Sequence, residues 1–130
     1  MTQSYDNCFV CGAANPIGLK LVFRYDESGH AHSEVILAEH FEGYPQVIHG
    51  GILSTLLDEV MAKAVIHSGK IAFTAKLQVS YRRPVKPDVK LRLEGWITEA
   101  KSRTIKTAAR VYDSEGSFAE AEAVFIVAKS

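Results

Sequence analysis

The sequence predicts an α+β domain in which one long helix packs against an antiparallel β-sheet. One segment in the middle of the chain has the apolar spacing of an amphipathic helix, and short segments with strand character lie on both sides of it. Their order is two strands, the helix, and then four strands. Because every apolar face has to be buried against another layer, we expect the single helix to cover one face of a twisted sheet.

The helix is predicted over residues 50–67. Its apolar residues recur at positions i, i+1, i+4 and i+5, which places them on one broad stripe. They are Ile52, Leu53, Leu56, Leu57, Val60, Met61, Ala64 and Val65. We expect the helix to end near Ser68 and Gly69, because glycine readily adopts the left-handed conformation of a helix C-cap.

Alternating apolar and polar residues predict the strands. Before the helix, a strand starts near Gly18, and a turn at 26–29 connects it to a second strand over 31–37 in a hairpin. An irregular loop follows over 38–48. After the helix, we expect strands over residues 71–82, 89–99, 104–113 and 117–128, with prolines ending the first of them.

Length and charge limit the classes of function. The chain of 130 residues is expected to form a single domain over 1–130, with no room for a separate cofactor domain. Lys plus Arg and Asp plus Glu each number 15, which argues against a nucleic-acid partner. No apolar run approaches the ~20 residues of a membrane span. The first fifteen residues lack the features of a targeting signal, so we expect a cytoplasmic protein.

The start of the predicted helix is a candidate catalytic element. His49, Gly50 and Gly51 lie where the loop becomes the helix, so unpaired backbone N–H groups and the positive end of the helix dipole are exposed there. Such groups can stabilise a thioester carbonyl oxygen that becomes an oxyanion when attacked. The alternative is an ordinary glycine-rich turn that His49 caps.

Asp58 is the candidate carboxylate. It lies two turns into the helix at the edge of the apolar stripe, where it could act as a general base or a nucleophile, or be a solvated side chain. Eight residues at ~1.5 Å each separate it from Gly50 by ~12 Å. One chain therefore cannot bring both groups to one substrate atom, which predicts a homodimer whose helices run antiparallel across a two-fold axis.

The segment His49-Gly50-Gly51-Ile52-Leu53-Ser54-Thr55-Leu56-Leu57-Asp58 resembles the signature of hotdog-fold thioesterases, the group of phenylacetate-pathway and hydroxybenzoyl-CoA thioesterases. The resemblance implies a hotdog fold, hydrolysis of an acyl-CoA thioester to free acid and CoA, no cofactor or metal, and a homodimer or homotetramer. It also implies roles for four residues: Asp58 is the catalytic carboxylate, the Gly50 N–H polarises the carbonyl, His49 orders the loop, and Thr74 positions the attacking water.

Two differences leave details of this resemblance open. Several relatives carry an asparagine about six residues before the histidine, where this chain has the segment 43–46 ending in Gln46. Another branch of the superfamily uses a helix glutamate, which makes Glu59 a competitor. We expect Glu59 instead to form a surface ion pair with Lys63, four residues further on.

Substrate contacts are expected around the helix start and a cationic strand end. Gly51 allows close approach of the substrate, and Arg82, Arg83 and Lys86 could bind the phosphates of CoA, although exposed cations also occur there without a ligand. Lys101 and Arg103 are weaker candidates.

Cys8 and Cys11 form a C-x-x-C motif. A tetrahedral zinc site needs four ligands, and a second such motif is absent, so zinc would require histidines or cysteines of a partner chain. The strand-to-helix context of a thioredoxin motif is also missing. The N-terminal motif resembles that of one bacterial subset of the family, and we expect the cysteines to pack near the acyl pocket.

Two rival functions remain at this stage. A non-catalytic module could bind acyl-CoA in the same pocket. A hydroxyacyl-thioester dehydratase would pair a loop histidine, here His40, with a glutamate about fourteen residues later, but this chain has Ser54 at that place.

Overall fold

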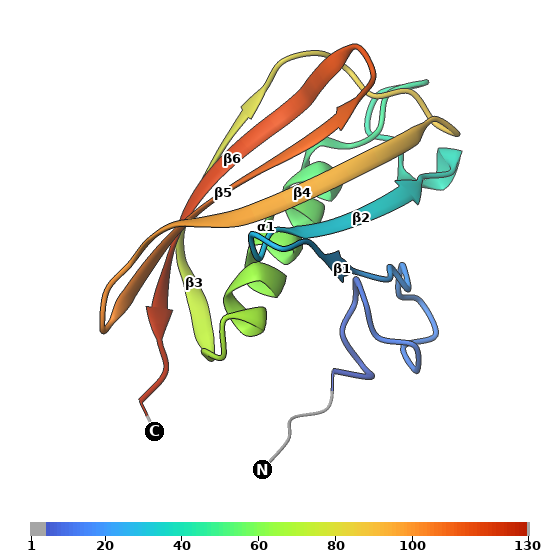
Figure 1. Ribbon diagram of the computed structural model, residues 1–130. Coiled ribbons are helices and arrows are strands. Elements are labelled where there is room, and N and C mark those ends of the chain that lie inside the picture. The colour runs from blue at the N-terminus through green and yellow to red at the C-terminus, as the bar shows by residue number, and fades with distance from the viewer. Residues whose placement is uncertain (1–4, 130) are drawn as a thin grey trace.

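The computed structural model describes residues 5–129, which form a curved six-stranded sheet around one long helix (Figure 1). All strand pairs are antiparallel, and the order across the sheet is β1-β2-β4-β5-β6-β3. The elements are β1 (Arg24–Tyr25), β2 (Ala31–Ile36), the short 3-10 helix η1 (Glu39–Phe41), α1 (Gly50–His67), β3 (Ala72–Tyr81), β4 (Lys90–Ala100), β5 (Thr104–Asp113) and β6 (Gly116–Val127). The predicted α+β class is confirmed.

Helix α1 fills the concave side of the sheet, and its bounds agree with the predicted ones. All the residues of the predicted apolar stripe are buried except Ile52, which is partly buried. The helix ends at His67, and Gly69, just after the C-cap Ser68, has a φ of +92°, the left-handed conformation expected of a glycine that terminates a helix.

Gly95 sets how closely the helix approaches the sheet. A Cβ atom at this position of β4 would lie 2.7 Å from the backbone carbonyl carbon and oxygen of Val60 and 3.0 Å from the amide nitrogen of Met61. Only glycine leaves room for the helix backbone at this distance. The middle of α1 is therefore held directly against the centre of the sheet.

The prediction of a first strand that starts near Gly18 is mostly wrong. Strand β1 contains only Arg24 and Tyr25, and the chain before it is irregular. The backbone N–H groups of Leu19 and Leu21 donate to the carbonyls of Phe9 and Val10 rather than to a neighbouring strand of the sheet. Pairing with the N-terminal segment thus replaces the expected hairpin over this stretch.

The other strands lie within two residues of their predicted ends, and β3 is at an edge of the sheet. Within residues 5–129, β3 pairs only with β6. Three of its large side chains are exposed, with Phe73 at 67%, Tyr81 at 53% and Leu77 at 37%. A long edge strand with exposed apolar side chains can pair with another chain.

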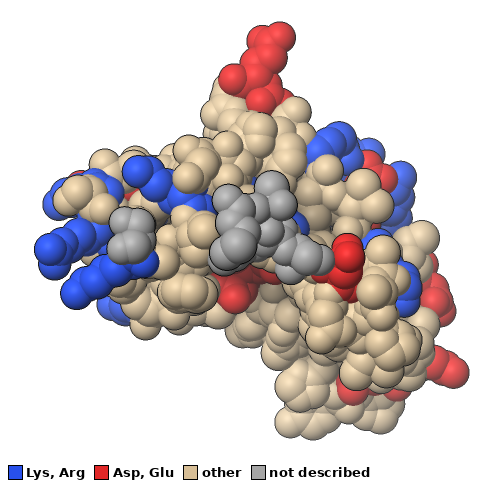
Figure 2. All heavy atoms as spheres, turned by 90° about the horizontal axis from the view of Figure 1, so that it is seen from below, with Lys and Arg blue, Asp and Glu red and all other residues tan. Residues whose placement is uncertain are grey.

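The surface carries both signs of charge. Figure 2 shows basic side chains gathered at the end of this face where the turn between β4 and β5 lies in Figure 1, with acidic side chains scattered elsewhere. No helix within residues 5–129 is both long and apolar enough to cross a membrane.

Replacing Gly95 with alanine tests the close contact between α1 and β4. The added methyl group would clash with the backbone of α1, so we expect the free energy of unfolding to fall by ~1–3 kcal/mol. Urea denaturation at fixed protein concentration measures this. The control Ser114→Ala, in an exposed turn, should change it by less than ~0.5 kcal/mol. Equal effects of the two substitutions would contradict the packing argument.

Candidate active site

The start of α1 is a turn capped by His49, the arrangement that the sequence offers as the alternative to a catalytic element. His49 is the N-cap, and its Nδ1 atom accepts a hydrogen bond of 2.9 Å from the Gly51 N–H. The Gly50 N–H donates to no acceptor within residues 5–129. The Gly51 amide is thus used by the cap, and Gly50 offers the remaining donor at the positive end of the helix dipole.

Tyr81, near the end of β3, fixes this helix start from the side. Its hydroxyl donates to the Gly50 carbonyl at 2.9 Å and lies 2.6 Å from Ser54 Oγ. Sequence reasoning missed this role of Tyr81. The signal was the polar residue Ser54, one turn after Gly50, on a helix whose other side is apolar.

Asp58 and Thr74, both proposed as catalytic residues, are in contact with each other. The Thr74 hydroxyl donates to Asp58 Oδ1 at 2.7 Å. Asp58 is half-buried on α1, and Thr74 is exposed on β3. The carboxylate therefore points toward the edge strand and away from the apolar stripe.

Glu59 points to a different side of the helix. Its Oε2 lies 3.8 Å from Lys63 Nζ and 3.4 Å from Cys8 Sγ. The predicted ion pair with Lys63 exists, but it is not a surface pair: the side chains of Glu59 and Lys63 are only 17% and 13% exposed. The N-terminal segment covers them, which the helix periodicity alone does not reveal.

Two hollows flank Gly50. One lies against the loop before the helix and is lined by Gly43, Tyr44, Val47, Ile48, His49 and Gly50. The other lies between the helix start and the chain after β3, and is lined by Val47, Ile48, Gly50, Leu53 and residues 81–85. Of the predicted cations, Arg82 and Arg83 therefore border the same hollow as the Gly50 donor.

The three predicted cations differ in their environment. Arg83 is held in place: it pairs with Asp113, lies 3.7 Å from a carboxylate oxygen of Glu115 and stacks at 3.6 Å on the Phe118 ring. Arg82 is 59% exposed and pairs with Glu120 at 2.9 Å. Lys86 is exposed. The charge of Arg83 is thus largely offset within the chain.

The chain before the helix contains Gln46, which replaces the asparagine of several relatives, and His40, the candidate dehydratase histidine. Gln46 adopts a φ of +65°, and its backbone N–H donates to a carboxylate oxygen of Glu42 at 2.9 Å. His40 is exposed, with its ring 4.2 Å from that of Phe41. Ser54, at the position of a dehydratase glutamate, faces Tyr81.

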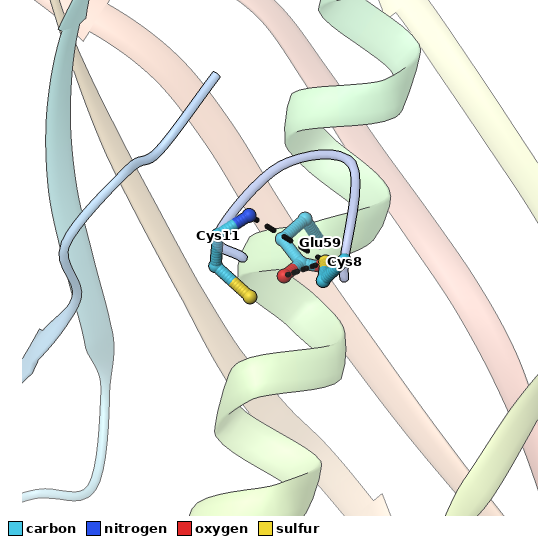
Figure 3. Close-up of side chains that lie close together, drawn as sticks. All are labelled: Cys8, Cys11 and Glu59. Carbon is cyan, nitrogen blue, oxygen red and sulfur yellow. Dashed lines mark hydrogen bonds between the residues drawn. The ribbon is translucent and has the colours of Figure 1, made fainter. Parts of the chain in front are cut away.

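Cys8 and Cys11 pack on α1 at Glu59, as Figure 3 shows. Both are half-buried free thiols. Burial, helped by the nearby Glu59 carboxylate, raises the pKa of the Cys11 thiol to about 12. Reactive cysteines have lowered pKa values, so this environment is unlike that of a redox-active motif.

A second cluster contains Asp26, His30 and Glu94, whose ligand atoms lie within 4.8 Å of one another. Glu94 accepts hydrogen bonds from His30 at 2.7 Å and from Arg110 Nε at 3.0 Å, and it forms an ion pair with Arg110 Nη2 at 2.9 Å. Burial raises the pKa of Glu94, but these hydrogen bonds outweigh it and lower the pKa overall. Protein cations already neutralise this carboxylate, which disfavours a metal ion.

A curved antiparallel sheet wrapped around one long helix, with a donor at the helix start, defines the hotdog class of proteins. A model of the thioesterase superfamily matches residues 45–119. The chain belongs to this superfamily.

Two curated relatives differ in activity. The chain is 26% identical over 89 residues to an acyl-coenzyme A thioesterase of Mus musculus, THEM4, covering 67% of this chain but only 38% of that protein. It is 32% identical over 100 residues to the 3-hydroxyacyl-[acyl-carrier-protein] dehydratase FabZ of Desulforamulus reducens, covering 73% of this chain and 70% of the dehydratase.

Solved structures share the fold. A thioesterase superfamily protein superposes with a TM-score of 0.84 at 30% identity, covering 89% of this chain and 61% of that chain. A hypothetical thioesterase of Streptococcus pneumoniae, solved with coenzyme A, has a TM-score of 0.78 at 22% identity, covering 85% of this chain and 87% of that chain. That protein was also solved as an aspartate-to-alanine and as a threonine-to-alanine variant.

Tyr81→Phe tests how the helix start is held. The variant loses the hydrogen bonds to the Gly50 carbonyl and Ser54, so we expect the free energy of unfolding to fall by ~0.5–1.5 kcal/mol. Urea denaturation at one protein concentration measures it. Tyr44→Phe, whose side chain is 82% exposed, is the matched control. A Tyr81→Phe protein as stable as the control would show that the hydroxyl does not anchor the helix.

Proposed function

We propose that this protein hydrolyses an acyl-CoA thioester to a free acid and CoA. The observation that carries the proposal is the Asp58 carboxylate, which accepts a 2.7 Å hydrogen bond from Thr74 on an exposed strand edge. Membership of the thioesterase superfamily and the coenzyme A bound by a structural neighbour support it. In the Streptococcus protein, the substituted aspartate and threonine are 16 residues apart, as are Asp58 and Thr74.

In the proposed reaction, Asp58 acts as a general base. It takes a proton from water, whose oxygen forms a bond to the thioester carbonyl carbon. The carbonyl oxygen becomes an oxyanion, which the Gly50 N–H and the helix dipole stabilise. When the C–S bond breaks, the proton on Asp58 passes to the leaving CoA sulfur. Thr74 holds one carboxylate oxygen, so that the carboxylate keeps its direction toward the water.

The site is completed by a second subunit in this proposal. Gly50 and Asp58 lie ~12 Å apart along one helix, and β3 offers a free edge with exposed apolar side chains. Antiparallel pairing of β3 with the same strand of a second copy would continue the sheet across a two-fold axis. The two α1 helices then run antiparallel, which brings Gly50 of one chain toward Asp58 of the other. A tetramer could form from two such dimers.

The CoA phosphates are proposed to lie beside the hollow after β3. Of the three cations expected there, Arg83 is partly buried between two carboxylates, whereas Lys86 and Arg82 are exposed, with Glu120 as the partner of Arg82. Phosphate oxygens are favourable partners for such side chains. We therefore assign the phosphate contacts to Lys86 and Arg82 rather than to Arg83.

The dehydratase match makes hydration of enoyl thioesters the second candidate. It would need a carboxylate opposite His40, but the corresponding place holds Ser54, which bonds to Tyr81. A panel of short, long and aromatic acyl-CoAs, together with enoyl-CoAs, separates the alternatives. Free-thiol release supports hydrolysis, hydration of enoyl-CoA supports a dehydratase, and binding without turnover supports an acyl-CoA-binding module.

Asp58→Asn tests the carboxylate. Asparagine has the same shape but cannot take a proton from water, so we expect kcat for acyl-CoA hydrolysis to fall at least ~100-fold. The control is Glu27→Gln, which removes an exposed carboxylate from the turn after β1 and should leave kcat unchanged. Circular dichroism verifies that both variants are folded. Full activity of a folded Asp58→Asn protein would remove Asp58 from the mechanism.

Gly50→Pro removes the proposed donor, and like the Gly50→Ala control it places a Cβ atom 3.3 Å from the Tyr81 hydroxyl. Proline is well tolerated at the first helical position, and the ψ of 131° at His49 suits a residue that precedes proline. We expect kcat to be ~100-fold or more lower than in Gly50→Ala, which adds a Cβ but keeps the N–H. Equal kcat values in the two variants would contradict a role for this donor.

Mixed dimers test the sharing of the site. If Gly50 of one chain works with Asp58 of the other, co-expressed Asp58→Asn and Gly50→Pro chains form mixed dimers that each retain one intact site. With random pairing, about a quarter of the wild-type activity should return. Activity no higher than that of the separate variants would place both residues in sites made by one chain.

A further inference from the structure

The N-terminal segment over residues 5–21 lies against α1 without forming a helix or a strand (Figure 1). Its backbone is held by turns and by the hydrogen bonds of Leu19 and Leu21 to Phe9 and Val10. Among its side chains, only Val10 and Leu21 belong to the buried core. Segments with so small a core are commonly fixed by a disulfide or a metal ion.

Cys8 and Cys11 are arranged by a tight turn within this segment. The Cys11 N–H donates to Cys8 Sγ at 3.5 Å, and the Gly12 N–H donates to the Cys8 carbonyl at 2.9 Å. A Cβ at Gly12 would lie 2.3 Å from the Asp6 carbonyl oxygen, so the turn requires glycine there. A backbone N–H directed at the first sulfur stabilises that sulfur as a thiolate, the form in which cysteine binds a metal.

Glu59 supplies a third ligand atom from α1. The two sulfurs and a Glu59 carboxylate oxygen all lie within 4.8 Å of one another (Figure 3). With Zn–S of ~2.3 Å and Zn–O of ~2.0 Å, the sulfur-to-oxygen edge of a tetrahedral zinc site is about 3.5 Å long. The distance from Cys8 Sγ to Glu59 Oε2 is 3.4 Å, so this edge needs almost no adjustment.

We propose that Cys8, Cys11 and Glu59 bind a structural Zn²⁺ ion that clamps the N-terminal segment to α1, with water as the fourth ligand. This site needs neither a histidine nor a cysteine from another chain, because the third protein ligand comes from the helix. The sequence does not suggest it, since Glu59 is 51 residues from Cys8.

Lys63 balances the charge of the proposed site. Two thiolates and a carboxylate carry three negative charges, so the zinc complex has a net charge of −1. The Lys63 ammonium lies 3.8 Å from Glu59 Oε2. The same ammonium lies 5.2 Å from the centre of the Tyr5 ring and 5.6 Å from the centre of the Phe23 ring. A nearby cation neutralises the complex in this half-buried place, where an unbalanced charge would be costly. Two sulfurs favour zinc over magnesium or calcium, which prefer oxygen ligands only.

Metal binding to the full-length, untagged protein tests this site. Reduced protein freed of metal with a chelator is titrated with Zn²⁺, and with Co²⁺ as a spectroscopic probe. We expect one metal ion per chain, a thiolate-to-cobalt charge-transfer band, and a rise in the thermal midpoint on adding zinc. Each of these readouts is independent of acyl-CoA hydrolysis, so a failure of the proposed function would leave the result intact.

Variants assign the ligands. Cys8→Ser and Cys11→Ser should each lose the charge-transfer band and the zinc-dependent thermal shift, and Glu59→Gln should weaken binding while keeping the band. Glu39→Gln, an exposed glutamate outside the cluster, is the matched control with unchanged stoichiometry. If a cysteine variant does not fold, the zinc affinities of Glu59→Gln and Glu39→Gln still show whether Glu59 is a ligand.

Three results would overturn the proposal. The first is reduced wild-type protein that binds no zinc. The second is binding that persists unchanged in both cysteine variants, which would mean adventitious surface sites. The third is equal zinc affinity in Glu59→Gln and Glu39→Gln, since Glu59 would then not be a ligand. The oxidised protein could also be stabilised by a disulfide between Cys8 and Cys11 and bind no metal after reduction. That result would mean that a covalent bond, and not zinc, fixes the N-terminal segment.

Discussion

The close contact between α1 and the centre of the sheet is the constraint on which the rest of the structure depends. Because Gly95 has no side chain, the backbone of the helix lies directly against β4, and the apolar stripe of α1 fills the concave side of the sheet. A helix fixed in this way cannot rotate or slide without losing its core contacts. Its other two sides can therefore hold polar groups in definite positions.

One of these sides faces β3 and the other faces the N-terminal segment. On the first, Tyr81 binds the Gly50 carbonyl and Thr74 binds Asp58, so a single edge strand holds both the start and the middle of the helix. Since β3 is also one of the two edge strands of the sheet, the strand that fixes the proposed catalytic groups is the one that our proposal pairs with a second subunit. This links assembly to catalysis in the proposed function.

The sequence alone predicts the regular parts of the structure well. Periodicity locates the helix to the residue, because the apolar stripe from Ile52 to Val65 and a C-cap glycine leave little ambiguity. Contacts between distant segments are not readable in this way. The pairing of Leu19 with Phe9 and the contact of Cys8 with Glu59 depend on how the irregular N-terminal segment folds back, and the hydrogen bond of Tyr81 to Gly50 depends on how β3 packs beside α1.

Asp58 and Glu59 show why adjacent carboxylates can have unrelated roles. Consecutive residues of a helix point ~100° apart, so Asp58 faces the exposed edge strand while Glu59 faces the covered N-terminal segment. Asp58 lies beside the exposed Thr74, whereas Glu59 lies close to the Cys8 and Cys11 thiols and the Lys63 ammonium. The sequence leaves open which of these two carboxylates is catalytic. What distinguishes them is the side of the helix on which each lies, since their chemistry is the same. A carboxylate whose charge is already shared with a cation and two thiols is poorly suited to activate water, which favours Asp58 as the general base.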